Sequence, residues 1–217
     1  MSTRADGRDT RWAQHRAVRR RELVEAALRA IRRHGPSVGM DDISAEAGTS
    51  KTVIYRHFGD RTGLYSAVAE SVDQRILDSL RTATADWNTQ DPTALVGPMV
   101  DAYLSLVEKD PEIYRFVVTR PLLDGPVEHD PVAGLTDQIG AQVAQVLEAH
   151  LTLQGRDAAC AQTWGHGLVG FVRAAADHWM DSERSRPRQD VVADVTSLFA
   201  PALSGMPSTH QTTHDQD

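Results

Sequence analysis

The side chains most suited to chemistry lie close together, in the short segment Ser50–Phe58. Its polar residues form two rows at four-residue spacing, Lys51 with Tyr55 and Thr52 with Arg56. Residues four apart share one face of a helix, and Ile54 and Phe58 form an apolar row by the same rule. Ammonium, guanidinium and hydroxyl groups donate hydrogen bonds to phosphate oxygens and to the edges of bases. The segment therefore predicts a helix with one buried face and one face rich in hydrogen-bond donors.

The residues before this helix predict another short helix and a tight turn. Ile43 and Ala47 share one helical face, and Gly48 follows, where glycine is common because it adopts positive φ without strain. Ser50 is a residue type that caps the next helix by accepting a hydrogen bond from a free backbone N–H. This arrangement is typical of a helix-turn-helix unit, whose second helix lies in the major groove of DNA. An ordinary solvent-exposed helix has the same periodicity, so spacing alone leaves that alternative open.

Charge is distributed unevenly along the chain. Residues 1–66 contain 13 Lys and Arg against 8 Asp and Glu, a net charge of +5, whereas the remaining residues contain 10 against 22, a net charge of −12. A basic end attached to an acidic body is typical of a chain that binds nucleic acid through that end. The overall pI of about 5.7 hides this asymmetry.

Arginines precede the predicted helix-turn-helix unit. Arg19 and Arg20 open a helix whose apolar stripe ends before Gly35-Pro36. Because a guanidinium group binds phosphate oxygens in bidentate geometry, we expect both arginines to contact the DNA backbone. Residues 1–17 form a basic, polar arm, for which insertion into a minor groove and a role as a solvated terminus both stay open.

The same region resembles the TetR family of one-component bacterial transcriptional regulators. The resemblance covers about residues 18–80 and rests on a glycine, an Ile-Ala pair, a Gly-x-Ser turn, a Tyr-x-His-Phe run and a basic residue that opens the next helix. The matching residues are Gly35, Ile43, Ala47, Gly48, Ser50, Lys51, Ile54, Tyr55, His57, Phe58, Arg61 and Leu64. The resemblance implies an all-α fold, in which three helices form a DNA-binding head and a long fourth helix leads to a ligand-binding and dimerising body.

The resemblance also implies which side chains meet DNA. Those expected to face it are Lys51, Thr52, Val53, Tyr55, Arg56 and His57, joined by Arg61 as a phosphate contact at the start of the fourth helix. Thr49 stands where the family usually has a small apolar residue and adds a candidate phosphate contact. Together with Ser50 and the two arginines of the first helix, these residues make up the predicted DNA-binding set. Whether Arg56 and Lys51 read bases or hold phosphates stays open.

The rest of the chain predicts further helices and no strand. Asp-Pro pairs at 91–92, 110–111 and 130–131 each place a capping acid before a proline suited to a first helical turn. Apolar residues recur at helical spacing after each pair, so we predict an all-α protein of about nine helices. The predicted divisions are a basic flexible N-terminal arm (1–17), a helix-turn-helix domain (18–64), a helical ligand-binding and dimerisation domain (65–204, with 65–82 as connecting helix) and a disordered tail (205–217).

Two surfaces are expected in the body. A ligand pocket would be lined by Met99, Tyr103, Phe116, Leu135, Ile139, Val143, Leu168 and Phe171. An ordinary core has the same apolar stripes, so that alternative stays open. The family fold implies a dimer bundle built from the last two helices, with the candidate interface residues Trp164, Gly167, Ala174, His178, Val195 and Phe199. Packing inside one subunit would explain the glycines of this region equally well.

Catalytic and cofactor motifs are weak. Residues 165–170 match the glycine pattern of dinucleotide-binding turns, but that motif follows a strand, and the residues before it predict a helix. We therefore predict no catalytic residue, no metal ligand and no cofactor, and we do not expect an enzyme. The single cysteine and the absence of a signal-peptide pattern or a bilayer-length apolar run are typical of a protein of the reducing cytosol.

These observations predict a cytoplasmic, homodimeric regulator that binds double-stranded operator DNA and responds to a small-molecule effector, without membrane contact. The resemblance implies a repressor released from a palindromic operator. Residues 164–180 are similar to a branch of the family in which some members sense fatty acyl thioesters, which implies a lipophilic effector such as a fatty acid or an acyl thioester. Two alternatives stay open: an all-α enzyme that binds a small molecule, and a DNA-binding protein that ignores ligands.

Overall fold

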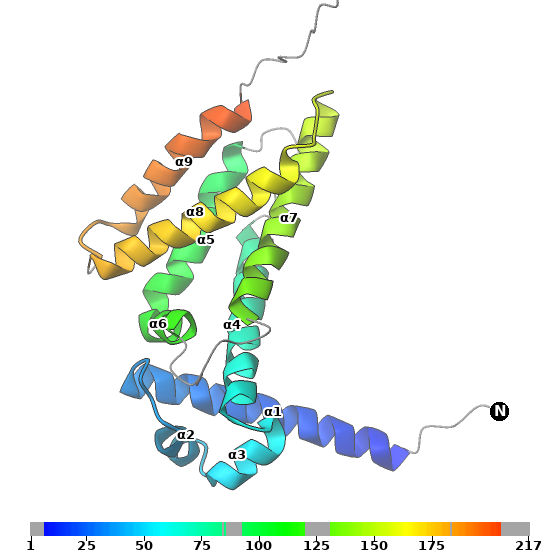
Figure 1. Cartoon of the computed structure of the whole chain (residues 1–217), viewed down its shortest axis with the longest axis vertical. Coiled ribbons are helices and arrows are strands. Elements are labelled where there is room, and N and C mark those ends of the chain that lie inside the picture. The colour runs from blue at the N-terminus through cyan, green and yellow to red at the C-terminus, as the bar shows by residue number, and fades with distance from the viewer. Residues whose placement is uncertain (1–6, 84, 86–92, 120–130, 183, 205–217) are drawn as a thin grey trace, which may run out of the picture. The chain divides into compact units, whose positions relative to one another are not determined.

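A computed structural model describes residues 7–83, 85, 93–119, 131–182 and 184–204 (Figure 1). Within these ranges the chain forms nine α-helices and no strand, which confirms the predicted all-α fold. None of these described helices has the length and apolar character needed to cross a membrane. The chain divides into two compact units, one of residues 1–74 and 110–132 and the other of residues 75–109 and 133–217.

The first unit begins with a long helix. Its helices are α1 (Gly7–His34), α2 (Met40–Glu46), α3 (Lys51–Phe58), the first part of α4 (Arg61–Ala83), and α6 (Pro111–Thr119). The sequence predicted a flexible arm over residues 1–17, whereas α1 already begins at Gly7. Residues 11–18 are all exposed, so this part of α1 has no apolar stripe by which a sequence reveals a helix. Residues 1–6 and the predicted tail 205–217 lie outside the described residues.

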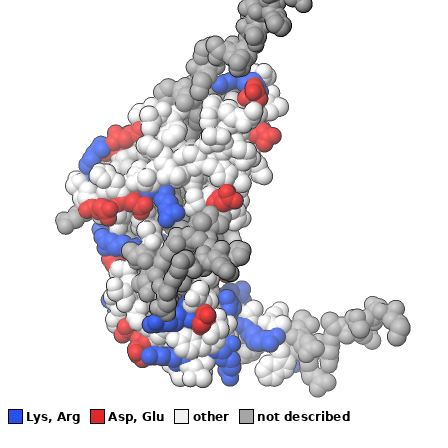
Figure 2. All heavy atoms as spheres, in the orientation of Figure 1, with Lys and Arg blue, Asp and Glu red and all other residues white. Residues whose placement is uncertain are grey.

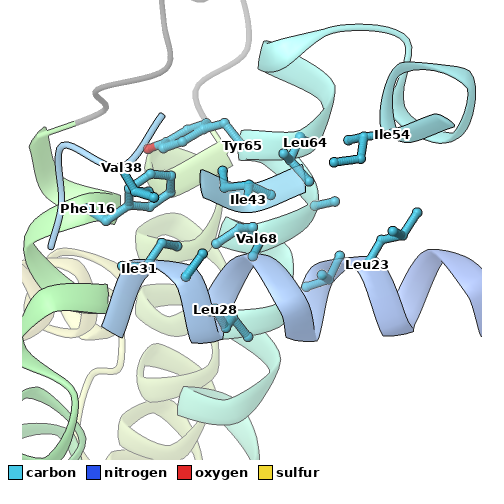
Figure 3. Packing of buried hydrophobic residues seen from close by; sticks show 14 of the residues in the cluster. Leu23, Leu28, Ile31, Val38, Ile43, Ile54, Leu64, Tyr65, Val68 and Phe116 are labelled. Atoms are coloured by element: carbon cyan, nitrogen blue, oxygen red, sulfur yellow. The ribbon is translucent and has the colours of Figure 1, made fainter. Parts of the chain in front are cut away.

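One apolar cluster holds the first unit together (Figure 3). Its almost fully buried members on α1 to α4 include Leu23, Leu28, Ile31, Ile43, Ile54, Leu64, Tyr65 and Val68. On α1 the buried positions follow the three- and four-residue spacing of a helical stripe, as the sequence predicted. Because each helix buries one face in this cluster, the direction of its opposite face is also fixed.

α6 belongs to this core although it lies far along the chain. Phe116 is fully buried, and its ring centroid lies 5.9 Å from that of Tyr65. The hydroxyl of Tyr65 donates a buried hydrogen bond of 2.7 Å to the carbonyl oxygen of Val117. At the start of α6, the guanidinium of Arg32 donates to both carboxylate oxygens of Asp110, at 2.7 and 3.0 Å. The predicted boundaries assigned this helix to the body, whereas these contacts make it part of the first unit.

The second unit is a separate set of packed helices. It contains the rest of α4, α5 (Thr93–Lys109), most of α7 (Pro131–Leu153), α8 (Ala161–Asp181) and α9 (Arg188–Ser204). α5 and α9 pack along one another (Figure 1). Arg188, at the start of α9, reinforces this pair by donating to Asp101 at 2.9 Å and to Glu108 at 2.5 Å.

α7 and α8 approach each other closely at a glycine. A Cβ atom on Gly165 of α8 would lie 2.6 Å from the backbone nitrogen of Ala144 on α7, so no larger residue fits there. The next residue, His166, joins the two helices: its Nδ1 lies 2.8 Å from the carbonyl oxygen of Gln162 and its Nε2 lies 3.0 Å from Oδ1 of Asp137. The carbonyl of Gln162 and the carboxylate of Asp137 raise the pKa of the His166 imidazole. Gly165 therefore serves packing within one chain.

Candidate DNA-binding surface

The turn between α2 and α3 is held by hydrogen bonds. The backbone turns at Gly48, whose φ is +59°, and the N–H of Thr49 donates back to the carbonyl oxygen of Ser44 at 3.0 Å. Ser50 then caps α3, because its hydroxyl oxygen accepts from the N–H of Val53 at 3.4 Å. The glycine turn and the serine cap that the sequence predicted are both present.

α3 buries one side and exposes the other. Ile54 is 1% exposed and Phe58 is 8% exposed, and both belong to the core of the first unit. Thr52 and Arg56 are exposed, as is the capping Ser50. The other candidate contacts around this helix are partly exposed: Thr49, Lys51, Val53, Tyr55 and His57. Tyr55 also packs against the core cluster, so part of its side chain supports the helix rather than facing outward.

Lys51 already has an anionic partner in the free protein. Its ammonium nitrogen lies 2.7 Å from Oδ1 of Asp41 on α2, and both side chains remain substantially exposed. A phosphate group that binds Lys51 therefore has to compete with this carboxylate. Helical spacing does not reveal this pair, because the two residues lie on different helices.

Arg20, one of the predicted phosphate contacts, has two partners within the first unit. Its guanidinium donates to the carbonyl oxygen of His57 at 2.8 Å and lies 4.4 Å from the centroid of the Phe58 ring. The first contact satisfies a carbonyl in the last turn of α3, and the second is a cation–π contact. Arg20 thus fastens α1 to the C-terminal end of α3. Arg19 forms an ion pair with Glu22 on its own helix, at 2.8 Å, and its side chain is 37% exposed.

The C-terminal end of α3 is surrounded by positive charge. Partial burial lowers the pKa of His57, and the nearby guanidinium groups of Arg56, Arg19 and Arg20 lower it further. His57 is therefore a neutral hydrogen-bonding group at neutral pH. Figure 2 shows further Lys and Arg side chains over the visible face of α1 to α3. A surface of this kind attracts polyanions.

α4 begins beside this surface. The chain turns at Gly59, whose φ is +84°, and Oδ1 of Asp60 accepts a hydrogen bond of 2.7 Å from the N–H of Gly63. Asp60 thereby caps the first turn of α4. Arg61 is exposed in this turn, which is where a phosphate contact was predicted.

Most of the predicted pocket residues belong to the second unit. Ile139, Val143 and Leu168 are buried there, on α7 and α8. Met99 and Tyr103 are partly exposed on α5. Leu135 lies in α7, but its side chain is outside the described part of the structure.

Two predicted pocket residues require correction. Phe116 is completely buried against Tyr65 in the core of the first unit, so it does not line a pocket of the second. Phe171 is 41% exposed on α8, where its ring makes an edge contact with Phe199 of α9 at a centroid distance of 5.1 Å. Both errors have one cause, since an apolar residue at helical spacing does not reveal which neighbour its helix packs against.

The predicted dimer residues divide into two groups. Gly167, Ala174 and His178 are exposed on one side of α8, and Trp164 and Phe199 are partly exposed. Val195 is only 3% exposed and belongs to the core of the second unit, so its assignment to an outer surface is corrected. Leu198, which was not among the predicted residues, is 55% exposed on α9 and is one of the large exposed apolar side chains among the described residues.

The fold and this surface define a class of protein: an all-helical DNA-binding regulator of the helix-turn-helix type. Comparison with known families gives the assignment. The model for bacterial regulatory proteins of the tetR family matches residues 23–68, and the model for the tetracyclin repressor-like C-terminal domain matches residues 79–214. The chain belongs to the TetR family of bacterial transcriptional regulators.

Two relatives are similar in sequence along almost the whole chain. An HTH-type transcriptional regulator of Mycobacterium tuberculosis is 33% identical over 208 residues, which cover 95% of this chain and 86% of the relative. The HTH-type transcriptional activator FasR of Mycolicibacterium smegmatis is 26% identical over 195 residues, which cover 89% and 87%.

Solved structures share the fold at low sequence identity. A tetR-family transcriptional regulator of Streptomyces coelicolor superposes with a TM-score of 0.67 at 22% identity, covering 86% of this chain and 80% of that one. The regulator FadR of Bacillus subtilis, solved in complex with stearoyl-CoA, superposes with a TM-score of 0.64 at 12% identity, covering 82% and 96%.

Proposed function

We propose that this chain acts as a homodimer whose two α3 helices enter major grooves of a pseudo-palindromic operator, and that a small lipophilic effector releases it. The observation that carries the DNA-binding part is the orientation of α3. Its apolar row, Ile54 and Phe58, is buried in the core, which directs Thr52 and Arg56 outward. A recognition helix needs this combination of a fixed inner face and a polar outer face.

Different roles are proposed for the residues of this surface. Arg56 is the candidate for base reading, because an exposed guanidinium can donate to both acceptors of guanine. Val53 offers methyl groups that can pack on a thymine methyl. The remaining candidates are proposed to fix register through phosphates: Arg19, Thr49, Ser50, Lys51, Thr52, Tyr55, His57 and Arg61. Arg20 is proposed to act indirectly, by holding the end of α3.

The proposed dimer surface is the outer side of α8 and α9. Gly167, Gly170 and Ala174 follow helical spacing on α8, and a Cβ atom on either glycine would meet nothing within 4 Å. Phe171 and Leu198 add exposed apolar area to the same pair of helices. Small residues let two helices approach closely, and exposed apolar patches mark contact surfaces. Two-fold pairing here would give the protein the symmetry of a palindromic site.

The effector is proposed to bind in the second unit. Its helices are lined with apolar residues, and Met99, Tyr103, Ile139, Val143 and Leu168 remain the candidate contacts, with Leu135 as a further candidate. The stearoyl-CoA complex of the structural neighbour FadR supports a long aliphatic ligand for a fold of this kind. A fatty acid or an acyl thioester is therefore the proposed class.

The proposed coupling follows the path of the chain. The polypeptide passes between the two units three times: within α4 after Gln74, between Lys109 and Asp110, and within α7 after Val132. The second passage leads into α6, which is anchored to the first unit by the Tyr65–Val117 hydrogen bond. A ligand that prefers one arrangement of the second unit can act on the first unit through these passages, by its difference in affinity between the two states.

The proposal is tested by incubating purified protein with fragmented genomic DNA and sequencing the bound fraction. We expect a shared motif with two-fold symmetry, and dissociation of that complex when a fatty acid or an acyl thioester is added. The absence of any enriched motif at moderate ionic strength would refute the DNA-binding part. An enriched motif that no lipid affects would instead favour a ligand-independent DNA-binding protein.

Repression is proposed because the resemblance implies it, but the named relative FasR is an activator. A reporter gene placed behind the selected operator separates the two modes. Higher expression after deletion of the regulator supports repression, whereas lower expression supports activation.

A further inference from the structure

Among the described residues, the second unit contains a buried imidazole without a hydrogen-bond partner. His150, in the last part of α7, is only 4% exposed. Both of its ring nitrogens are buried, and neither has a hydrogen-bond partner among the residues that the structure describes. Ser44, the other buried polar residue of the described core, differs because its hydroxyl donates to the carbonyl oxygen of Asp41 at 2.9 Å.

The position of His150 on α7 places it in an apolar row. The buried residues of this helix follow one stripe and include Ile139, Val143, Ala144, Leu147 and Leu151. His150 occupies the next position of the stripe, three residues after Leu147. Its neighbours Glu148 and Ala149 are exposed and point away from this stripe. The imidazole therefore lies on the inward face of the helix, among hydrocarbon side chains of its own stripe.

An isolated polar group of this kind is rare in folded proteins. Nearly all buried polar atoms have a hydrogen-bond partner, because burying one without a partner sacrifices its bonds to water. A neutral imidazole offers one N–H donor and one nitrogen acceptor, so it has two bonds to make. Such an exception in an otherwise apolar stripe points to a partner that enters from outside the chain.

We propose that His150 is the polar anchor of the effector site, and that its ring N–H donates a hydrogen bond to the carbonyl oxygen at one end of an aliphatic ligand. The inference rests on the proposed function, in which the second unit binds a lipophilic effector, and it specifies how the ligand is oriented. The stripe offers this one side chain to satisfy polar ligand atoms. The part of the ligand that lies beside this stripe is therefore a hydrocarbon chain that ends in one carbonyl or carboxylate group.

Two ligand types share this chemistry. A free fatty acid presents a carboxylate oxygen, and an acyl thioester presents a thioester carbonyl oxygen, each at the end of the chain. Dodecanoate and dodecanoyl-CoA represent the two types, and bromododecane is a matched ligand of similar length without oxygen. Binding of all three to the full chain is measured by intrinsic tryptophan fluorescence and by calorimetry.

Two substitutions separate hydrogen bonding from shape. We expect His150→Leu to weaken binding of at least one of the oxygen-bearing ligands about tenfold or more, because their carbonyl loses its donor in an apolar site. The affinity for bromododecane should change by less than about threefold, because bromododecane accepts no hydrogen bond from His150. We expect His150→Gln to retain much of the affinity, because its amide N–H can donate. Ala149→Leu, at the exposed neighbouring position, is the control and should bind like the native protein.

A second measurement follows ligand binding in the native protein, and a substituted protein is needed only to identify the NMR signal of His150. Isotope-labelled histidine reports hydrogen bonding at each ring nitrogen by NMR, and the His150→Gln spectrum identifies the signal of His150. We expect saturating ligand to shift that signal more than those of the exposed histidines. This result stays informative even if His150→Leu folds poorly, which circular dichroism detects.

The outcomes distinguish the inference from the function on which it rests. The inference alone is overturned if an oxygen-bearing ligand binds the native protein, His150→Leu keeps the native preference for that ligand over bromododecane, and the His150 signal stays unchanged. The proposed effector class would then still stand. If neither lipid binds the native protein although operator binding persists, the proposed effector class fails and the inference fails with it.

Discussion

The ammonium nitrogen of Lys51 lies 2.7 Å from a carboxylate oxygen of Asp41, which joins the first turn of α3 to the helix before it. Both side chains are largely exposed, so this pair contributes only about 0–1 kcal/mol to folding, and a phosphate can displace the carboxylate. We expect Asp41→Asn to raise DNA affinity roughly two- to tenfold at low salt, because Lys51 is freed and a negative charge leaves the surface. Fluorescence anisotropy with labelled operator measures the change.

The effect of Asp41 should depend on Lys51. In a Lys51→Ala background, we expect Asp41→Asn to increase DNA affinity much less than it does in the native protein. Glu148→Gln removes an exposed carboxylate of the second unit and serves as the charge control. An equal gain from both carboxylate substitutions would mean that net charge, rather than release of Lys51, sets the affinity.

Arg20→Ala should lower folding stability, and its effect on DNA affinity should be indirect. The substitution removes the hydrogen bond to the His57 carbonyl and the contact with the Phe58 ring. We expect the free energy of unfolding to fall by about 1–2 kcal/mol, the sum of a part-exposed charged hydrogen bond and a cation–π contact. Denaturant titration measures it. Unchanged stability together with a large loss of DNA affinity would restore Arg20 to the set of direct phosphate contacts.

Arg56→Ala should show the opposite pattern. Its side chain is exposed, so folding stability should change by less than about 0.5 kcal/mol. We expect the affinity for the selected operator to fall by about 1–3 kcal/mol and one base position to lose its preference. Binding to the operator and to scrambled DNA is compared at one salt concentration. An equal loss on both sequences would show that Arg56 holds phosphate only.

We expect Asp73 on α4 to make folding stability dependent on pH. Burial, with a smaller contribution from Glu70, raises the pKa of its carboxyl group from 3.8 to about 7. One of its oxygens is buried without a hydrogen-bond partner among the described residues. Because the folded state favours the protonated form, Asp73 lowers the free energy of unfolding progressively as pH rises from the unfolded pKa to the folded pKa.

Asp73→Asn tests this effect. At about pH 8 we expect the variant to be more stable than the native chain by on the order of 1–2 kcal/mol, a value reduced because the side chain is partly exposed. The difference should shrink as pH falls and approach zero only below about pH 3, where the native carboxyl is protonated in both states. Denaturant titrations across this range measure it. A constant difference at every pH would trace the effect to packing instead of ionisation.

Gly170→Arg tests the proposed dimer surface. A Cβ atom at this position meets nothing within 4 Å, so the larger side chain should fold normally and obstruct only a second subunit. We expect the variant to sediment as a monomer and to lose about a hundredfold or more in operator affinity, since each half-site is then bound separately. Ala149→Arg, at an exposed position of α7, is the matched control. A Gly170→Arg dimer would place the interface elsewhere.

Local chemistry made the DNA-binding segment predictable. The positive φ of Gly48 and the cap formed by Ser50 depend on neighbours within a few residues, and the buried row of Ile54 and Phe58 follows from helical spacing alone. These features need no knowledge of distant parts of the chain. The all-α class followed in the same way, from repeated caps and apolar stripes.

Contacts between distant residues were not predictable. Arg20 meets the His57 carbonyl across 37 positions, and Phe116 meets Tyr65 from a helix that follows α5. A stripe indicates that Phe116 and Val195 are buried, but not in which core. The ion pair of Lys51 and Asp41 could not be predicted for the same reason. Exposed charged residues have no periodic pattern that would indicate their partner.

The participation of α6 in the first core affects how this protein can be divided. A fragment that ends after α4 would leave the ring of Tyr65 uncovered and its hydroxyl without the Val117 carbonyl. Arg32 would also lose its carboxylate partner, Asp110. The DNA-reading part is therefore not a transplantable N-terminal module. A chimera that joins this recognition helix to a foreign sensor must carry residues 110–119 across the junction, or replace them with a segment that fills the same space.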